Sequence, residues 1–210
     1  LVRQLEMDHV ASCRCEGLPN VAVYAEGDQS VKAPVRIYAD DAHDLLALRS
    51  DVPVSPSAAG EFATCITGWL AERDVTPIYL VGMAAEKDGV PEMYGVGTAD
   101  GPALLAEHDV AAPDEMGMVS GPTGALVAEA EAQGLDSVGL VVESNPKFPD
   151  PEAARVLIQE GIGPIAGVDV DTDELVEQAE EIADARQQLA QQMSEADEES
   201  SQAQPLGMFQ

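Results

Sequence analysis

The stretch that decides the expected fold is GPTGALVAEAEAQGLDSVGLVVES, residues 121–144. Its first part, from the turn Gly121-Pro-Thr-Gly124 through Gln133, predicts a helix, which Gly134 would end in the C′ position that favours a left-handed backbone. Its last part, SVGLVVE, is a nearly continuous apolar run, typical of a strand that is buried on both faces. A helix followed so closely by such a strand is the repeating unit of α/β proteins.

The same alternation continues on both sides of this stretch. Downstream, residues 151–159 predict a helix with Asp150 as its N-cap and Pro151 at its first position. Upstream, residues 77–84, PIYLVGMA, predict a second buried strand, central in its sheet. Strands separated by helices favour parallel pairing through right-handed crossovers. We therefore expect a three-layer α/β/α sandwich with a mostly parallel or mixed sheet.

The first half of the chain is richer in short strands, which Gly, Pro and Asp clusters separate. A helix is predicted where large apolar residues recur at helical spacing, over residues 57–72. The other elements expected here are strands at 10–15, 20–25, 34–39, 44–48 and 92–97, and helices at 1–8 and 101–107.

The end of the chain has a different character. A helix is expected over residues 171–193, where Asp171 and Glu174 fit a capping box and apolar residues recur as in a short coiled coil or a helix packed on one side. Residues 194–204 are polar and acidic, so we expect disorder before the final PLGMFQ. The expected division is an α/β domain at 1–170, a C-terminal helix at 171–193 and a flexible acidic tail at 194–210. The apolar tip is either a docking element or a frayed terminus.

Charge is the most unusual bulk property. The chain has 39 acidic and 10 basic residues, a net charge of -29, and the acidic residues are spread along its length. Such self-repulsion weakens a compact state unless salt screens it, so we expect the cytoplasm of a salt-adapted organism. An ordinary acidic protein from a low-salt cell is the alternative. Nucleic acid is not an expected partner, because no basic stripe is present to neutralise phosphates. We expect no membrane span either, because the longest uncharged stretch is too short.

Few residues suggest a catalytic, metal-binding or ligand-binding site. The three cysteines, Cys13, Cys15 and Cys65, do not define a disulfide framework, and we expect Cys13 and Cys15 to pack in the interior. The turn at Gly121–Gly124 can be a tight turn or an anion-binding helix start, although neither nucleotide fingerprint is present. No cofactor, metal site or catalytic constellation is expected.

Taken in order, these motifs resemble the second proteasome assembly chaperone family. The family pattern is a Gly-x-Ser/Thr-Gly turn, a helix ending in Gly, a strand ending in Glu, a Pro-Asp-Pro-x-Ala-Ala helix and an Asp-x-x-x-Leu helix. The matching residues are Gly121, Thr123, Gly124, Gly134, Glu143, Pro149, Asp150, Pro151, Ala153, Ala154, Asp171 and Leu175. Family members begin with a strand and a Gly-rich turn that this chain lacks, so we expect some tens of residues, including one sheet strand, to be missing before Leu1.

The resemblance implies a homo-oligomeric chaperone or adaptor that binds proteasome core α-subunits or the α-ring. Several such factors end in a hydrophobic residue, Tyr and any residue, and Met208, Phe209 and Gln210 look like a variant of that docking motif. An alternative is a small-molecule-binding enzyme of a fold similar to nucleoside phosphorylases and related hydrolases, with Gly121, Thr123, Gly124 and Glu143 as an anion or ligand site. A third hypothesis is an interaction module with a partner unrelated to the proteasome.

Overall fold

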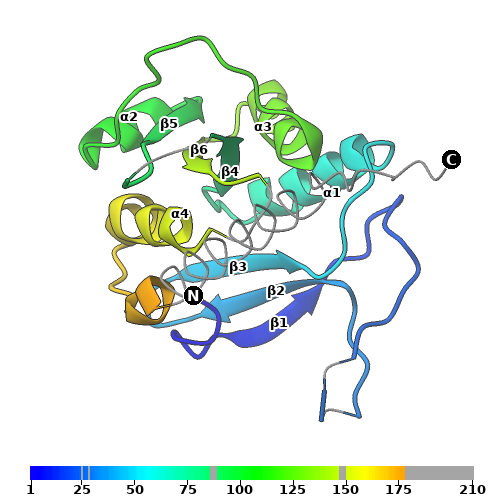
Figure 1. The fold of residues 1–210 in the computed structure, drawn as a ribbon. Coiled ribbons are helices and arrows are strands. Elements are labelled where there is room, and N and C mark those ends of the chain that lie inside the picture. Colours follow the sequence, from blue (N-terminus) through cyan, green and yellow to red (C-terminus); the bar gives the residue numbers. More distant parts are fainter. Residues whose placement is uncertain (25, 28, 86–88, 147–149, 178–210) are drawn as a thin grey trace, which may run out of the picture.

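A computed structural model describes residues 1–177 except 25, 28, 86–88 and 147–149. The described residues form two three-stranded sheets with helices packed around them (Figure 1). The mixed α/β sandwich expected from the sequence is confirmed, but the strands are divided between two sheets. The predicted helix beyond residue 177 and the predicted acidic tail lie outside the described residues.

The first sheet is antiparallel and is formed by the N-terminal strands. Its order is β1-β2-β3, with β1 at Asp8–Ser12, β2 at Val35–Asp40 and β3 at Leu45–Ser50. A register irregularity interrupts β1 between His9 and Ala11. Three of the strands predicted in this half are confirmed with shifted ends. The strand predicted at 20–25 is wrong, because only an isolated bridge between Val23 and Lys32 forms there.

The second sheet contains the strands of the α/β unit. Its order is β4-β6-β5, with β4 at Ile78–Ala84, β6 at Ser137–Ser144 and β5 at Met93–Thr98. β4 and β6 are parallel, whereas β5 runs antiparallel to β6, so the sheet is mixed. In the part of the chain that the structure describes, β4 pairs only with β6, and the prediction of a central β4 is therefore wrong there.

Helices cover both faces of this second sheet. On one face, α2 (Gly101–Glu107) and the π-helical turn η1 (Leu157–Ile162) pack on β6 through the cluster Leu105, Val138, Leu140 and Ile162. On the same face, α4 (Pro151–Val156) packs Ala153 and Val156 against Val142, and the short α5 (Gly163–Ala166) follows η1. A buried apolar strand between helical layers is what the SVGLVVE run predicted.

The other face carries α1 (Ala59–Ala71) and α3 (Gly121–Gln133), which pack against each other. Tyr79 of β4 and Thr67 of α1 are both buried, and burial raises the pKa of the Tyr79 hydroxyl. An adjoining side of α1 contributes Phe62 and Ile66 to a second core with Val35 of β2 and Cys15. Helix α1 therefore joins the two sheets.

Single residues with strong local preferences account for several helix ends. Gly134 ends α3 with φ +65°, and the N–H of Leu135 bonds to the Ala130 carbonyl, as the C′ assignment predicted. Asp150 caps α4 by accepting the N–H of Ala153. The expected helix at 1–8 is reduced to a turn, which closes with hydrogen bonds from Glu6 to Arg3 and from Met7 to Val2 before β1 begins at Asp8.

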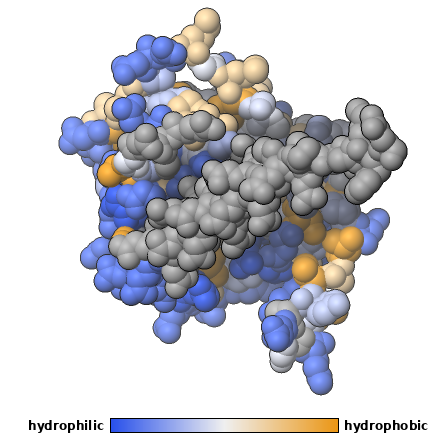
Figure 2. Space-filling view, viewed as in Figure 1, coloured by the Kyte–Doolittle hydropathy of each residue, from blue (hydrophilic) through white to orange (hydrophobic). Residues whose placement is uncertain are grey.

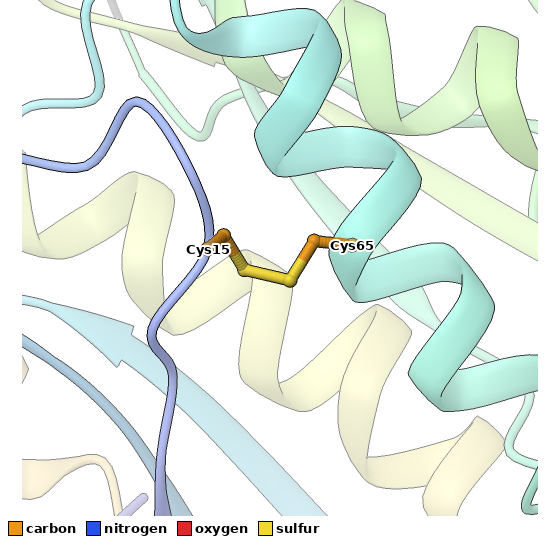
Figure 3. Close-up of a disulfide and its surroundings, with 2 residues drawn as sticks. All are labelled: Cys15 and Cys65. Atoms are coloured by element: carbon orange, nitrogen blue, oxygen red, sulfur yellow. A yellow bond between two sulfur atoms is a disulfide. The ribbon is translucent and has the colours of Figure 1, made fainter.

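The cysteine prediction is partly wrong. Cys15 and Cys65 form a disulfide that ties the segment after β1 to α1 (Figure 3). Cys13 is a free, half-buried thiol that packs against the same core, as expected. The pairing was missed because it joins residues 50 positions apart, and only the fold brings them within the span of a disulfide.

In the part of the chain covered by the structure, no helix has both the length and the apolar character needed to cross a membrane.

Candidate functional site

The turn that opens α3 owes its glycines to backbone geometry. Gly121 has φ +68°, a left-handed conformation that other residues rarely adopt. A Cβ at Gly124 would lie 2.4 Å from the carbonyl oxygen of Val119, so only glycine fits there. The Gly124 N–H also bonds to the Ser120 carbonyl at 3.2 Å. The tight-turn interpretation accounts for both positions.

Glu143 closes the end of the β5–β6 pair. Its carboxylate accepts the backbone N–H of Glu92 at 3.0 Å, and its own N–H donates to the Glu92 carbonyl at 3.0 Å. This reciprocal pair extends the ladder one step beyond Met93. The Glu143 carboxylate, which the sequence suggested as part of a ligand site, is therefore already hydrogen-bonded to the backbone.

The predicted ligand residues lie toward the same end of the sheet. Helix α3 leads directly into β6 and packs alongside it, so the start of α3 lies near the end of β6. The register puts Glu143 on the sheet face that also carries Met83 and Tyr94. The Tyr94 hydroxyl donates to the Met83 sulfur at 3.7 Å, and the loop before α3 passes this hydroxyl at Gly117.

Tyr94 and Met83 were not predicted as neighbours, because nothing in the sequence of a single strand indicates a contact across a sheet. The assignment of Gly121, Thr123, Gly124 and Glu143 to an anion or ligand site stays a prediction. Both glycines and the glutamate have structural explanations that need no ligand. Within the described ranges, no three His, Cys, Asp or Glu side chains are grouped so that they could hold a metal ion.

Two histidine pairs lie on the first sheet and its hairpin. His9 hydrogen-bonds Ser12 at 3.2 Å, and His43 hydrogen-bonds Asp40 at 2.6 Å, which lowers the pKa of the Asp40 carboxyl. The pairs use different histidines and are exposed. They therefore do not form the single Ser–His–Asp chain that a serine nucleophile needs.

Two exposed apolar segments are better candidates for partner contact. The loop between α2 and α3 exposes Met116 fully and Met118 at 89%, and it carries hydrophobic colours at the top of Figure 2. The arm at residues 19–34 projects from the body in Figure 1 and exposes Val21, Tyr24 and Val31. The arm is held together by backbone hydrogen bonds between Val23 and Lys32. Exposed apolar residues that gather on projecting segments often mark interaction sites.

The predicted docking residues Met208, Phe209 and Gln210 lie outside the described residues. Their role stays a prediction, and so does the division of the chain at residues 170 and 193.

Comparison with solved structures identifies the architecture. The chain is similar to Pyrococcus furiosus PbaA, described as an archaeal homolog of proteasome-assembly chaperone, with 25% identity, a TM-score of 0.77 and coverage of 95% of this chain and 82% of PbaA. It also shares its fold with Pyrococcus furiosus PbaB, an archaeal proteasome activator, at 20% identity and a TM-score of 0.74, over 90% of this chain and 84% of that one. The fold is thus the α/β sandwich of these proteins.

The family follows from the sequence match. Residues 1–190 match the PAC2 family, and this chain belongs to that family. An uncharacterized protein of Methanocaldococcus jannaschii is 27% identical over 160 residues, which are 76% of this chain and 65% of that protein. The chain therefore spans just under two thirds of the length of this relative.

Proposed function

We propose that this protein is a proteasome assembly chaperone or adaptor that binds the core α-subunits or the α-ring. The observation that carries the proposal is membership of the PAC2 family together with the likeness to PbaA, a homolog of proteasome-assembly chaperone, over nearly the whole chain. The exposed apolar residues of the arm and the loop support a binding role, because these side chains are not used to bury the chain's own core. On this proposal the protein acts in the cytoplasm without a cofactor.

The docking element is the C-terminal Met208-Phe209-Gln210. The ring of Phe209 would fill an apolar pocket between α-subunits, Met208 would add apolar contact, and the terminal carboxylate would pair with a basic group. Phe lacks the hydroxyl of the Tyr that such tails usually carry, so one hydrogen bond is lost. If the acidic segment before it is unstructured, as its composition predicts, ten residues span about 15–20 Å.

A homo-oligomer would strengthen this binding, because several tails on one particle raise the effective concentration of each. The net charge of -29 implies that assembly takes place at high salt, where repulsion between copies is screened.

An assembly experiment tests the proposed role. Purified α-subunits would be mixed at molar salt with and without this protein, and ring formation followed by sedimentation velocity. We expect the protein to accelerate ring formation or to co-sediment with α-subunits. Unchanged kinetics with no co-sedimentation would contradict the proposal, and an equally acidic, unrelated protein controls for charge.

A further inference from the structure

The segment that follows β1 is fastened along one side of α1. A Cβ at Gly17 would lie 2.8 Å from the Ala58 Cβ and 3.1 Å from the Glu61 carboxylate, so the backbone runs directly against the start of the helix. One turn further along, Cys15 is bonded to Cys65. Positions 58, 61 and 65 share one side of the helix, and the disulfide is the covalent part of this contact.

The two ends of the disulfide differ in access. Cys15 is 8% exposed and belongs to the core formed with Val35, Phe62 and Ile66, whereas Cys65 occupies an exposed position on α1. A thiolate from solution therefore has access to the bond from the side of Cys65. Cys13 is the one remaining thiol, and burial raises its pKa, so it is a poor internal nucleophile at neutral pH.

The disulfide ties the segment that leads into the exposed arm to α1, next to the base of the arm. The arm begins two residues after Gly17 and returns to β2 at Val35, where the Cys13 N–H bonds to the Val35 carbonyl at 2.9 Å. Arg36 adds a hydrogen bond to the Ala33 carbonyl at the other side of the base. Opening the disulfide would leave these contacts and the apolar packing, but would remove the covalent tie to α1.

We propose that Cys65 is a site of thiol–disulfide exchange with a low-molecular-weight thiol, and that the Cys15–Cys65 bond is a reversible clamp on the arm. In the first step the small thiolate attacks the Cys65 sulfur, the S–S bond breaks, and Cys15 leaves as a thiolate that takes a proton from water. A second small thiolate attacks the mixed disulfide and releases Cys65, which is protonated in turn. Two small thiols are oxidised to their disulfide, and the protein disulfide is reduced to two thiols.

The test uses the full chain at molar salt with reduced and oxidised glutathione as the probe. Alkylation and peptide mass mapping would follow the Cys15–Cys65 bond, and Cys15→Ser would trap a single glutathionyl group on Cys65. Hydrogen exchange of oxidised and reduced protein would then be compared. We expect residues 19–34 to exchange several-fold faster after reduction, with β6 unchanged as the internal control.

Three results would overturn the proposal. The bond could resist glutathione until the protein unfolds, the arm could exchange at the same rate in both states, or β6 could lose protection together with the arm. Cys13→Ser is the matched control, because it removes a neighbouring thiol and keeps the bond. In this variant the Cys15–Cys65 bond should be reduced at the same ratio of reduced to oxidised glutathione as in the wild type.

Discussion

Cys15 and Cys65 are 50 positions apart in the chain, yet their Cα atoms lie 5.9 Å apart and their sulfurs are bonded. The bond crosses from the segment that follows β1, a strand of the first sheet, to the helix that covers the second sheet (Figure 3). The disulfide therefore strengthens the packing of α1, the helix that joins the two sheets.

Removing this bond should lower stability without changing the fold. A closed loop of this length restricts the unfolded chain, and its loss typically costs about 2–4 kcal/mol. We expect Cys65→Ser to lower the free energy of unfolding by that amount, measured by denaturant titration at molar salt without reductant. Cys13→Ser should change it by less than about 1 kcal/mol. Equal effects of the two substitutions would argue against the assigned pairing.

Two glycine-to-alanine substitutions should have opposite effects. At Gly101 a Cβ would lie 1.9 Å from the backbone carbonyl oxygen of Ser137, so α2 must shift away from β6, and we expect a loss of roughly 1–3 kcal/mol. At Gly68, inside α1, a Cβ meets no atom within 4 Å, and alanine should add up to about 1 kcal/mol through helix propensity. Thermal unfolding of both variants checks the predicted signs. A stabilised Gly101→Ala protein would show that α2 does not approach β6 as described.

Cys13 should react slowly, and at higher pH than an ordinary thiol. Burial raises its pKa, so less thiolate is present at neutral pH. Because the folded-state pKa exceeds the unfolded value, the stability that Cys13 contributes is fully present below the ordinary thiol pKa of about 8.5. It is lost as pH rises through the raised value. The pH profile of alkylation, with free cysteine as the reference, should be displaced upward, and a coincident profile would contradict the buried position.

Stability should rise steeply with salt. Net charge -29 creates repulsion that extends about 10 Å at 0.1 M ionic strength and about 3 Å at 1 M. We expect the midpoint of thermal unfolding to increase from low to molar potassium chloride, and to increase with sodium chloride in the same way, because screening depends on ionic strength. A midpoint independent of salt would favour an ordinary acidic protein.

Local signals made the second half of the chain predictable. Gly134 and Asp150 mark helix ends through their own backbone and side-chain preferences, and the run at 137–143 has the composition of a strand covered on both faces. These features need no knowledge of distant residues. For that reason α3, β6 and the start of α4 were predicted within a residue or two.

The sequence alone did not predict which strands pair with each other or which distant side chains are in contact. Whether β5 runs parallel or antiparallel to β6, and whether the N-terminal strands join that sheet, depends on contacts between residues far apart. The same holds for the Tyr94–Met83 contact and the Cys15–Cys65 bond. The exposure of Tyr24 and Met116 is likewise a property of the fold, because both residue types are common in cores.

We propose above all that this protein binds the proteasome core through its last three residues. The most direct measurement is a pull-down of core α-subunits at molar salt, comparing the full chain with a chain that ends at Gly207. We predict that α-subunits are recovered with the full chain and lost with the shortened one, while thermal unfolding of the two proteins coincides. Equal recovery would move the binding site to the folded domain, and no recovery with either protein would contradict the proteasome assignment.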